Sequence, residues 1–155
     1  MKLSIKITIL LLVFSGIVAA FAATAEPGPG VTVTVEVFSG RTNPTFVLDD
    51  IAAIHRLRGD FSRLPAESPD GAQAAAFGHL GYRGIVIDNP HGVEGLPRYV
   101  QVLDGLVLVR DEAGSAPRYL RDTGSLEKRY LALAGAEGLI DELIEAGLVP
   151  DPSTM

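Results

Sequence analysis

The sequence predicts an α+β fold, in which a mainly antiparallel sheet of about four strands carries helices packed on one face. Three observations predict it. Valine alternates with other residues over positions 31–38, and a second valine-rich segment folds back on itself at Asp104-Gly105. Apolar residues recur at helical spacing over residues 50–58 and again from residue 125 onward. Together these segments supply one sheet and the helices that cover it.

The first strand is expected at "VTVTVEVF", residues 31–38, whose strict alternation is typical of a strand with one wet face. Residues 82–87 predict a buried strand, because three β-branched residues follow one another there. The segment "RYVQVLDGLVLVR" predicts a hairpin with a two-residue type I′ turn, in which Leu103 faces Leu106, Val102 faces Val107 and Val100 faces Val109. The valine faces of the first strand and of the hairpin are expected to form the dry side of the sheet, and the other hairpin face is expected to be half exposed.

The helices are expected to begin and end at recognisable residues. Asp49 or Asp50 caps the helix predicted over residues 50–58, and Gly59 stands where a left-handed end residue belongs. Two further helices are expected over residues 125–134 and 139–146, interrupted by Gly135 and ended by Gly147. Between residues 60 and 81 only a short helical turn at "AQAAAF" is expected.

The N-terminal 25 residues have the pattern of a secretory signal, with Lys2 and Lys6 before an apolar run and small residues at its end. Cleavage is expected after Ala25, with Ala22 as a second site, and an uncleaved membrane anchor is the alternative. Residues 26–30 are then a flexible leader, residues 31–148 a single α+β domain, and residues 149–155 a frayed tail. The expected location is secreted or periplasmic.

Composition narrows the function classes. The chain has 13 basic and 19 acidic residues, and removing Lys2 and Lys6 moves the net charge from −6 to about −8. Such a chain is not expected to bind nucleic acid. Nor is it expected to bind a membrane, unless the N-terminal 25 residues are retained. It contains no cysteine, which excludes disulfides, thiolate metal sites and a cysteine nucleophile.

The turn "FSGRTNP" that follows the first strand has two interpretations. Gly40 permits a positive φ and Pro44 cannot donate to a ladder, so the segment first indicates the end of a strand. Exposed polar residues there and on the mixed face of the hairpin are also the candidate ligand-binding residues. They are Arg41, Asn43, Tyr99, Gln101 and Arg110.

No catalytic residue and no cofactor is predicted. The three histidines, His55, His79 and His91, lack the spacing of a metal site, so no metal is expected. His91 with Asp88 in a loop, and Ser125 with Lys128 at Ser-x-x-Lys spacing, are the pairs that a small exported hydrolase would use. Turn formation and helix capping are the alternative roles of these four residues.

Three segments in order, "VFSGRTNP", "LGYRGIVI" and "RDTGSLEKRYLALAG", give the chain a family resemblance. It resembles small exported proteins of uncharacterised function in which a Ser-Gly-Arg-x-Asn-Pro turn follows the first strand. The resemblance covers most of the chain after the leader and implies one folded unit, but no activity.

The sequence therefore favours a non-catalytic binding or surface-associated domain with an unknown protein or envelope partner. A hydrolase and a purely structural envelope component are the alternatives.

Overall fold

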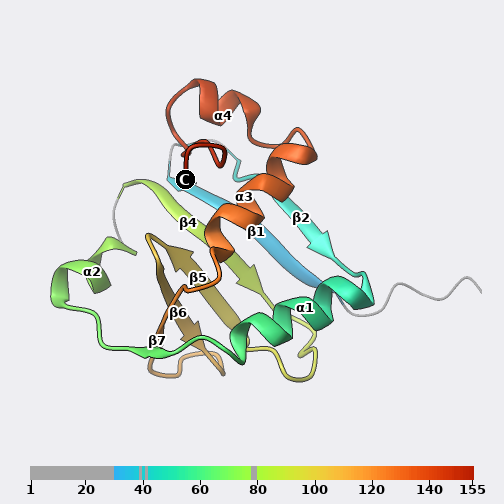
Figure 1. The fold of residues 1–155 in the computed structure, drawn as a ribbon, viewed down its shortest axis with the longest axis vertical. Coiled ribbons are helices and arrows are strands. Elements are labelled where there is room, and N and C mark those ends of the chain that lie inside the picture. Colours follow the sequence, from blue (N-terminus) through green and yellow to red (C-terminus); the bar gives the residue numbers. More distant parts are fainter. Residues whose placement is uncertain (1–29, 39, 41, 78–79) are drawn as a thin grey trace, which may run out of the picture.

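The strands form one antiparallel sheet in a computed structural model that describes residues 30–38, 40, 42–77 and 80–155. The strand order is β2-β1-β4-β5-β6-β7-β3 (Figure 1). The strands are β1 (Val31–Phe38), β2 (Thr45–Leu48), β3 (Ala66–Glu67), β4 (Gly81–Asp88), β5 (Tyr99–Leu103), β6 (Leu106–Arg110) and β7 (Arg118–Arg121). The helices are α1 (Ile51–Phe61), α2 (Gly71–Ala76), α3 (Leu126–Ala136) and α4 (Asp141–Glu145).

The predicted fold class is wrong. The described sheet has seven strands instead of about four, and its few helices are short. Nor do they share one face, because Phe77 at the end of α2 packs on the side opposite to α1 and α3. The missed strands β2, β3 and β7 have two to four residues each. Strands this short carry too few residues for alternation to stand out, and their ladder partners define them.

The two most regular segments form the predicted strands. β1 covers the predicted residues 31–38. The predicted hairpin register is confirmed in all three pairs, from Leu103 opposite Leu106 to Val100 opposite Val109. Asp104 and Gly105 have φ values of 48° and 75°, as a type I′ turn requires.

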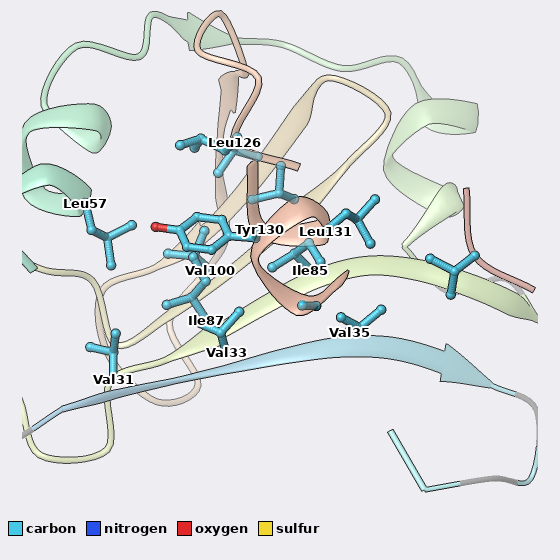
Figure 2. Packing of buried hydrophobic residues seen from close by; sticks show 14 of the residues in the cluster. Val31, Val33, Val35, Leu57, Ile85, Ile87, Val100, Leu126, Tyr130 and Leu131 are labelled. Atoms are coloured by element: carbon cyan, nitrogen blue, oxygen red, sulfur yellow. The ribbon is translucent and has the colours of Figure 1, made fainter. Parts of the chain in front are cut away.

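The dry side of the sheet is the predicted one. Valines of β1, β5 and β6 are almost fully buried, together with Ile85 and Ile87 of β4. Figure 2 shows Val31, Val33 and Val100 pointing toward the space that Leu57 of α1 and Tyr130 of α3 also enter. α1 and α3 cross in front of this side in Figure 1. Burial of each such side chain contributes roughly 1.5–3 kcal/mol to folding.

The helix ends differ in part from the prediction. The Asp50 side chain accepts from the Ala53 N–H at 2.8 Å, so Asp50 is the cap, but α1 runs past Gly59 to Phe61. Gly59 does not end the helix because its backbone stays helical and the chain continues into a Ser62 cap. Ser125 precedes α3 with φ 52° and makes no side-chain cap, contrary to the capping role considered for it. Gly147 follows α4 with φ 66°, as expected.

The opposite face of the sheet is closed only in part. Leu103, Leu106 and Leu108 are buried there beneath Phe77, so this half of the face is dry, not half exposed as expected. Among the described residues, no helix is both long and apolar enough to span a membrane. The predicted signal segment lies outside the described residues.

Candidate functional site

Four side chains form a row across the uncovered part of that opposite face. Thr32 of β1 pairs with Asp88 of β4, Asp88 with Tyr99 of β5, and Tyr99 with Arg110 of β6. Their chain neighbours Val31, Ile87, Val100 and Val109 are in the core, so alternation points these four to the other side. We call Thr32, Asp88, Tyr99 and Arg110 the polar row.

The polar row forms the floor of a hollow of about 550 Å³. Its walls come from two loops: Pro90 and Arg98 lie in the connection after β4, and residues 112–114 follow β6. The structure thus brings Tyr99 and Arg110, both predicted ligand-binding residues, into one concave surface. It adds Asp88, which the sequence suggested only as a partner for His91.

The charged groups of the hollow are arranged around the Tyr99 ring. The Arg110 guanidinium carbon lies 5.4 Å from the centre of that ring, a cation–π distance. Arg98 is occupied by its own loop, because its Nη1 donates to the carbonyls of Asn89 at 2.9 Å and Pro90 at 2.7 Å. Burial raises the pKa of the Asp88 carboxyl, and the nearby Arg98 charge opposes that rise. The Tyr99 hydroxyl also has a raised pKa, first because of burial and then because of the Glu36 and Asp88 charges.

A partly buried hydrogen-bond network holds the Tyr99 hydroxyl in place. The Tyr99 hydroxyl donates to Gln101 Oε1 at 3.0 Å. Gln101 Nε2 donates to the Arg83 carbonyl at 2.8 Å and to Glu36 Oε2 at 3.1 Å, and Arg83 pairs with Glu36 at 3.5 Å. Gln101 is only 3% exposed and does not line the hollow, so this predicted site residue positions the tyrosine from the neighbouring place on the same face of β5. Glu36 and Arg83 are not among the residues predicted from the sequence, where the one signal for them is the position of Glu36 on the wet face of β1.

The turn after β1 lies away from the hollow. Asn43 Oδ1 accepts from the Val37 N–H at 3.0 Å, and the Pro44 carbonyl accepts from the Val35 N–H at 2.9 Å. These bonds extend the β1 ladder beyond β2, at the end of β1 remote from Thr32. Asn43 is therefore part of the strand end, and Arg41 lies outside the described residues.

The residue pairs of the hydrolase alternative do not form catalytic arrangements within the described contacts. His91 is exposed and no hydrogen bond joins its ring to Asp88 in this part of the chain. Lys128 Nζ donates to the Met155 carbonyl at 2.5 Å, and no described bond joins it to the Ser125 hydroxyl. The described residues contain no group of three or more potential metal ligands, and His79 lies outside them.

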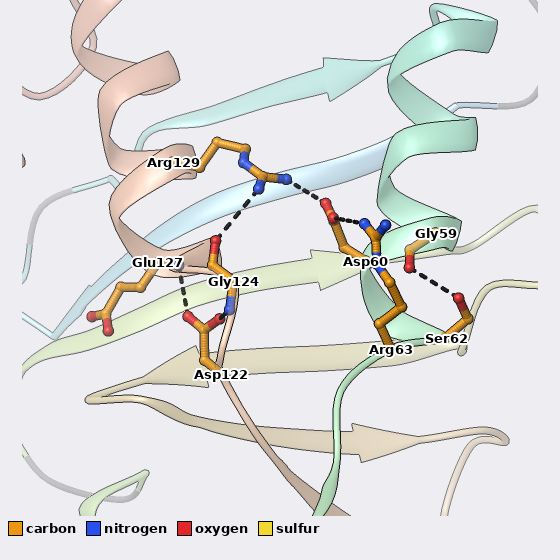
Figure 3. Close-up of polar contacts among 8 residues, drawn as sticks. All are labelled: Gly59, Asp60, Ser62, Arg63, Asp122, Gly124, Glu127 and Arg129. Atoms are coloured by element: carbon orange, nitrogen blue, oxygen red, sulfur yellow. Dashed lines mark hydrogen bonds and ion pairs between the residues drawn. The ribbon is translucent and has the colours of Figure 1, made fainter.

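Two buried carboxylates hold the helices in place (Figure 3). Asp60 of α1 pairs with Arg129 of α3 and, at 3.0 Å, with Arg63. Glu127 of α3 is 4% exposed and accepts from the Tyr82 hydroxyl and from the Asp104 N–H, both at 2.8 Å. Neither lines the polar row, so both are structural.

Comparison with known protein families, with curated proteins and with solved structures finds no significant match to this chain. The resemblance to exported proteins with a Ser-Gly-Arg-x-Asn-Pro turn stays a prediction.

Proposed function

We propose that this chain is an exported, non-catalytic binding domain that takes its ligand in the hollow above the polar row. The observation that carries the proposal is the row itself. Thr32, Asp88, Tyr99 and Arg110 come from four neighbouring strands and stand on a sheet whose other face is lined with valine. Polar groups that converge in a concave surface are the usual setting of a ligand site.

The hydrogen-bond network at the Tyr99 hydroxyl supports the interpretation of the hollow as a binding site and not merely as a solvated surface. A buried glutamine and an Arg83–Glu36 pair position one tyrosine, and Arg110 lies over its ring. A site built on strands and supported by a second layer of hydrogen bonds is preorganised, which reduces the entropy lost when a ligand binds.

Export to the cell exterior or periplasm and a ligand from that compartment are parts of the same proposal. They rest on the pattern of residues 1–25 and on the absence of cysteine from the sequence. The acidic net charge argues against nucleic acid as the ligand, because phosphate binding requires clustered lysine and arginine.

The test is a thermal-shift screen of small polar compounds against the purified protein. Compounds that occupy the hollow should raise the unfolding temperature of the wild type and should do so much less in Arg110→Gln. Arg56→Gln, which changes an exposed arginine of α1, is the matched control and should keep the full shift. If every stabilising compound acts equally on Arg110→Gln and on the wild type, the hollow is not the binding site.

A further inference from the structure

We propose that the hollow takes a zwitterionic ligand, a free α-amino acid, whose carboxylate binds Arg110 and whose ammonium binds Asp88. This inference rests on the binding role proposed above and names the class of ligand. It follows from the way opposite charges are placed around Tyr99.

Arg110 offers an unused anion-binding group. Among the described residues its guanidinium forms no ion pair and no hydrogen bond, whereas Arg83, Arg118, Arg121 and Arg129 each pair with a carboxylate. Its contact with the Tyr99 ring holds the guanidinium plane without occupying its N–H donors. A carboxylate is the group that such a fork binds in a bidentate manner.

Asp88 offers the complementary acceptor on the other side of Tyr99. Within the described chain its carboxylate forms no ion pair, and the neighbouring Arg98 directs its Nη1 to two backbone carbonyls and not to Asp88. Glu112 adds a second carboxylate at the rim of the hollow. Because burial disfavours the charged form of Asp88, a cation beside it gains more than it would at a fully hydrated carboxylate.

The spacing of the two groups selects a small ligand. Asp88 and Arg110 lie on strands that are separated by β5 alone, so their backbones are about 10 Å apart. Both side chains line the same hollow, so a ligand that reaches both of them has to place its two charges within that span. One amino acid does so, whereas the terminal charges of an extended peptide of four residues lie roughly 13 Å apart.

Other ligand classes fit less well. A saccharide ring would stack on an aromatic face, but the Arg110 guanidinium already occupies one face of the Tyr99 ring. A simple anion would meet the repulsion of Asp88 and Glu112, and a simple cation that of Arg98 and Arg110. A zwitterion satisfies both signs of charge, and Pro90 and Ala113 in the walls leave room for an apolar side chain.

The experiment measures the affinity of the purified full-length product for L-leucine, N-acetyl-L-leucine and L-leucinamide by calorimetry. The first carries both charges, the second lacks the ammonium and the third lacks the carboxylate. We expect wild-type protein to bind L-leucine about tenfold or more tightly than either derivative. Arg110→Gln should abolish the difference between leucine and leucinamide, and Asp88→Asn the difference between leucine and N-acetyl-leucine.

Each comparison is made within one variant, so a change in stability does not imitate the result, and Arg56→Gln should retain both differences. Equal affinity for all three leucine compounds would overturn the inference. If the wild type binds maltose and none of the leucine compounds, and Arg110→Gln loses maltose binding, the inference of an amino-acid ligand is also overturned. The proposed binding function would remain intact. If neither leucine, its derivatives, maltose nor inorganic phosphate binds in a manner sensitive to Arg110→Gln, both proposals fall.

Discussion

Asn43 shows how a single side chain can end a strand. Pro44 has no N–H, so only its carbonyl takes part in the ladder, where it accepts from the Val35 N–H. The Asn43 carboxamide oxygen accepts from the Val37 N–H, in place of the backbone carbonyl that a longer partner strand would offer. "FSGRTNP" is in this respect a strand terminator, and its asparagine has a structural task.

Glu127 allows a prediction at the residue scale. Burial raises the pKa of its carboxyl, outweighing the hydrogen bonds from Tyr82 and Asp104 N–H, and the Asp104 and Asp122 charges add to the rise. The native state therefore binds this proton more tightly than the unfolded chain does. The contribution of this carboxyl to the free energy of unfolding is fully present at pH values below the ordinary pKa of a glutamate. It is lost as the pH rises through the raised pKa of the native state.

Glu127→Gln removes that loss, because glutamine resembles the protonated acid and cannot ionise. We expect the variant to equal the wild type near pH 4 and to exceed it in free energy of unfolding at pH 7. Urea titrations at both pH values measure this, with Glu145→Gln on the exposed side of α4 as a control. A variant that is about 1–3 kcal/mol less stable at pH 7 would show that the two hydrogen bonds outweigh burial.

At the scale of the element, β4 depends on a glycine bulge. The register with β1 shifts between Val35 and Val37, where Arg83 and Gly84 oppose one residue of β1. Gly84 has φ 88°, and a Cβ added there would lie 1.9 Å from the Val102 carbonyl oxygen of β5. The bulge therefore requires glycine both for its backbone conformation and for the approach of the next strand.

Gly84→Ala is expected to lower the free energy of unfolding by about 3 kcal/mol or more, from backbone strain and overpacking together. Gly59→Ala should act in the opposite direction and stabilise by roughly 0.5–1 kcal/mol, because Gly59 lies inside α1 and a Cβ added there would lie 4.0 Å from Arg63 Nη2, an ordinary contact. Denaturant unfolding of both variants measures whether Gly84→Ala lowers the free energy of unfolding and Gly59→Ala raises it. Equal effects of the two substitutions would contradict the bulge interpretation.

The longer an element is, the better its local sequence pattern predicted it. The eight residues of β1 and the paired strands of the hairpin were recognisable because alternation extends over the whole segment. β3 has two residues and exists only through its bonds to β7, so it has no pattern of its own. Gly59 was misread because a glycine is allowed both at a helix end and within the helix.

At the scale of the whole molecule, the proposed export leads to a prediction about the N-terminus. Ala23 and Ala25 are the small residues that a signal peptidase requires before its cut. Expression of residues 1–155 in a secreting bacterium should release a product whose measured mass corresponds to a chain that begins at Glu26. Ala25→Leu, which places a bulky residue at the cut, should block that product or move the cut to follow Ala22. Recovery of wild-type protein beginning at Met1 in the membrane fraction would contradict export by cleavage.

The sequence by itself determined the local features: the valine faces, the hairpin register and the Asp50 cap. Each of these depends on residues that are close together in the chain, so periodicity and turn chemistry suffice. Only the tertiary structure decided the sheet order, the Gly84 bulge and the polar row. Thr32, Asp88, Tyr99 and Arg110 meet because β1 pairs with β4, where Thr32 and Asp88 are 56 positions apart in the chain, and a contact between such distant segments leaves no trace in local pattern.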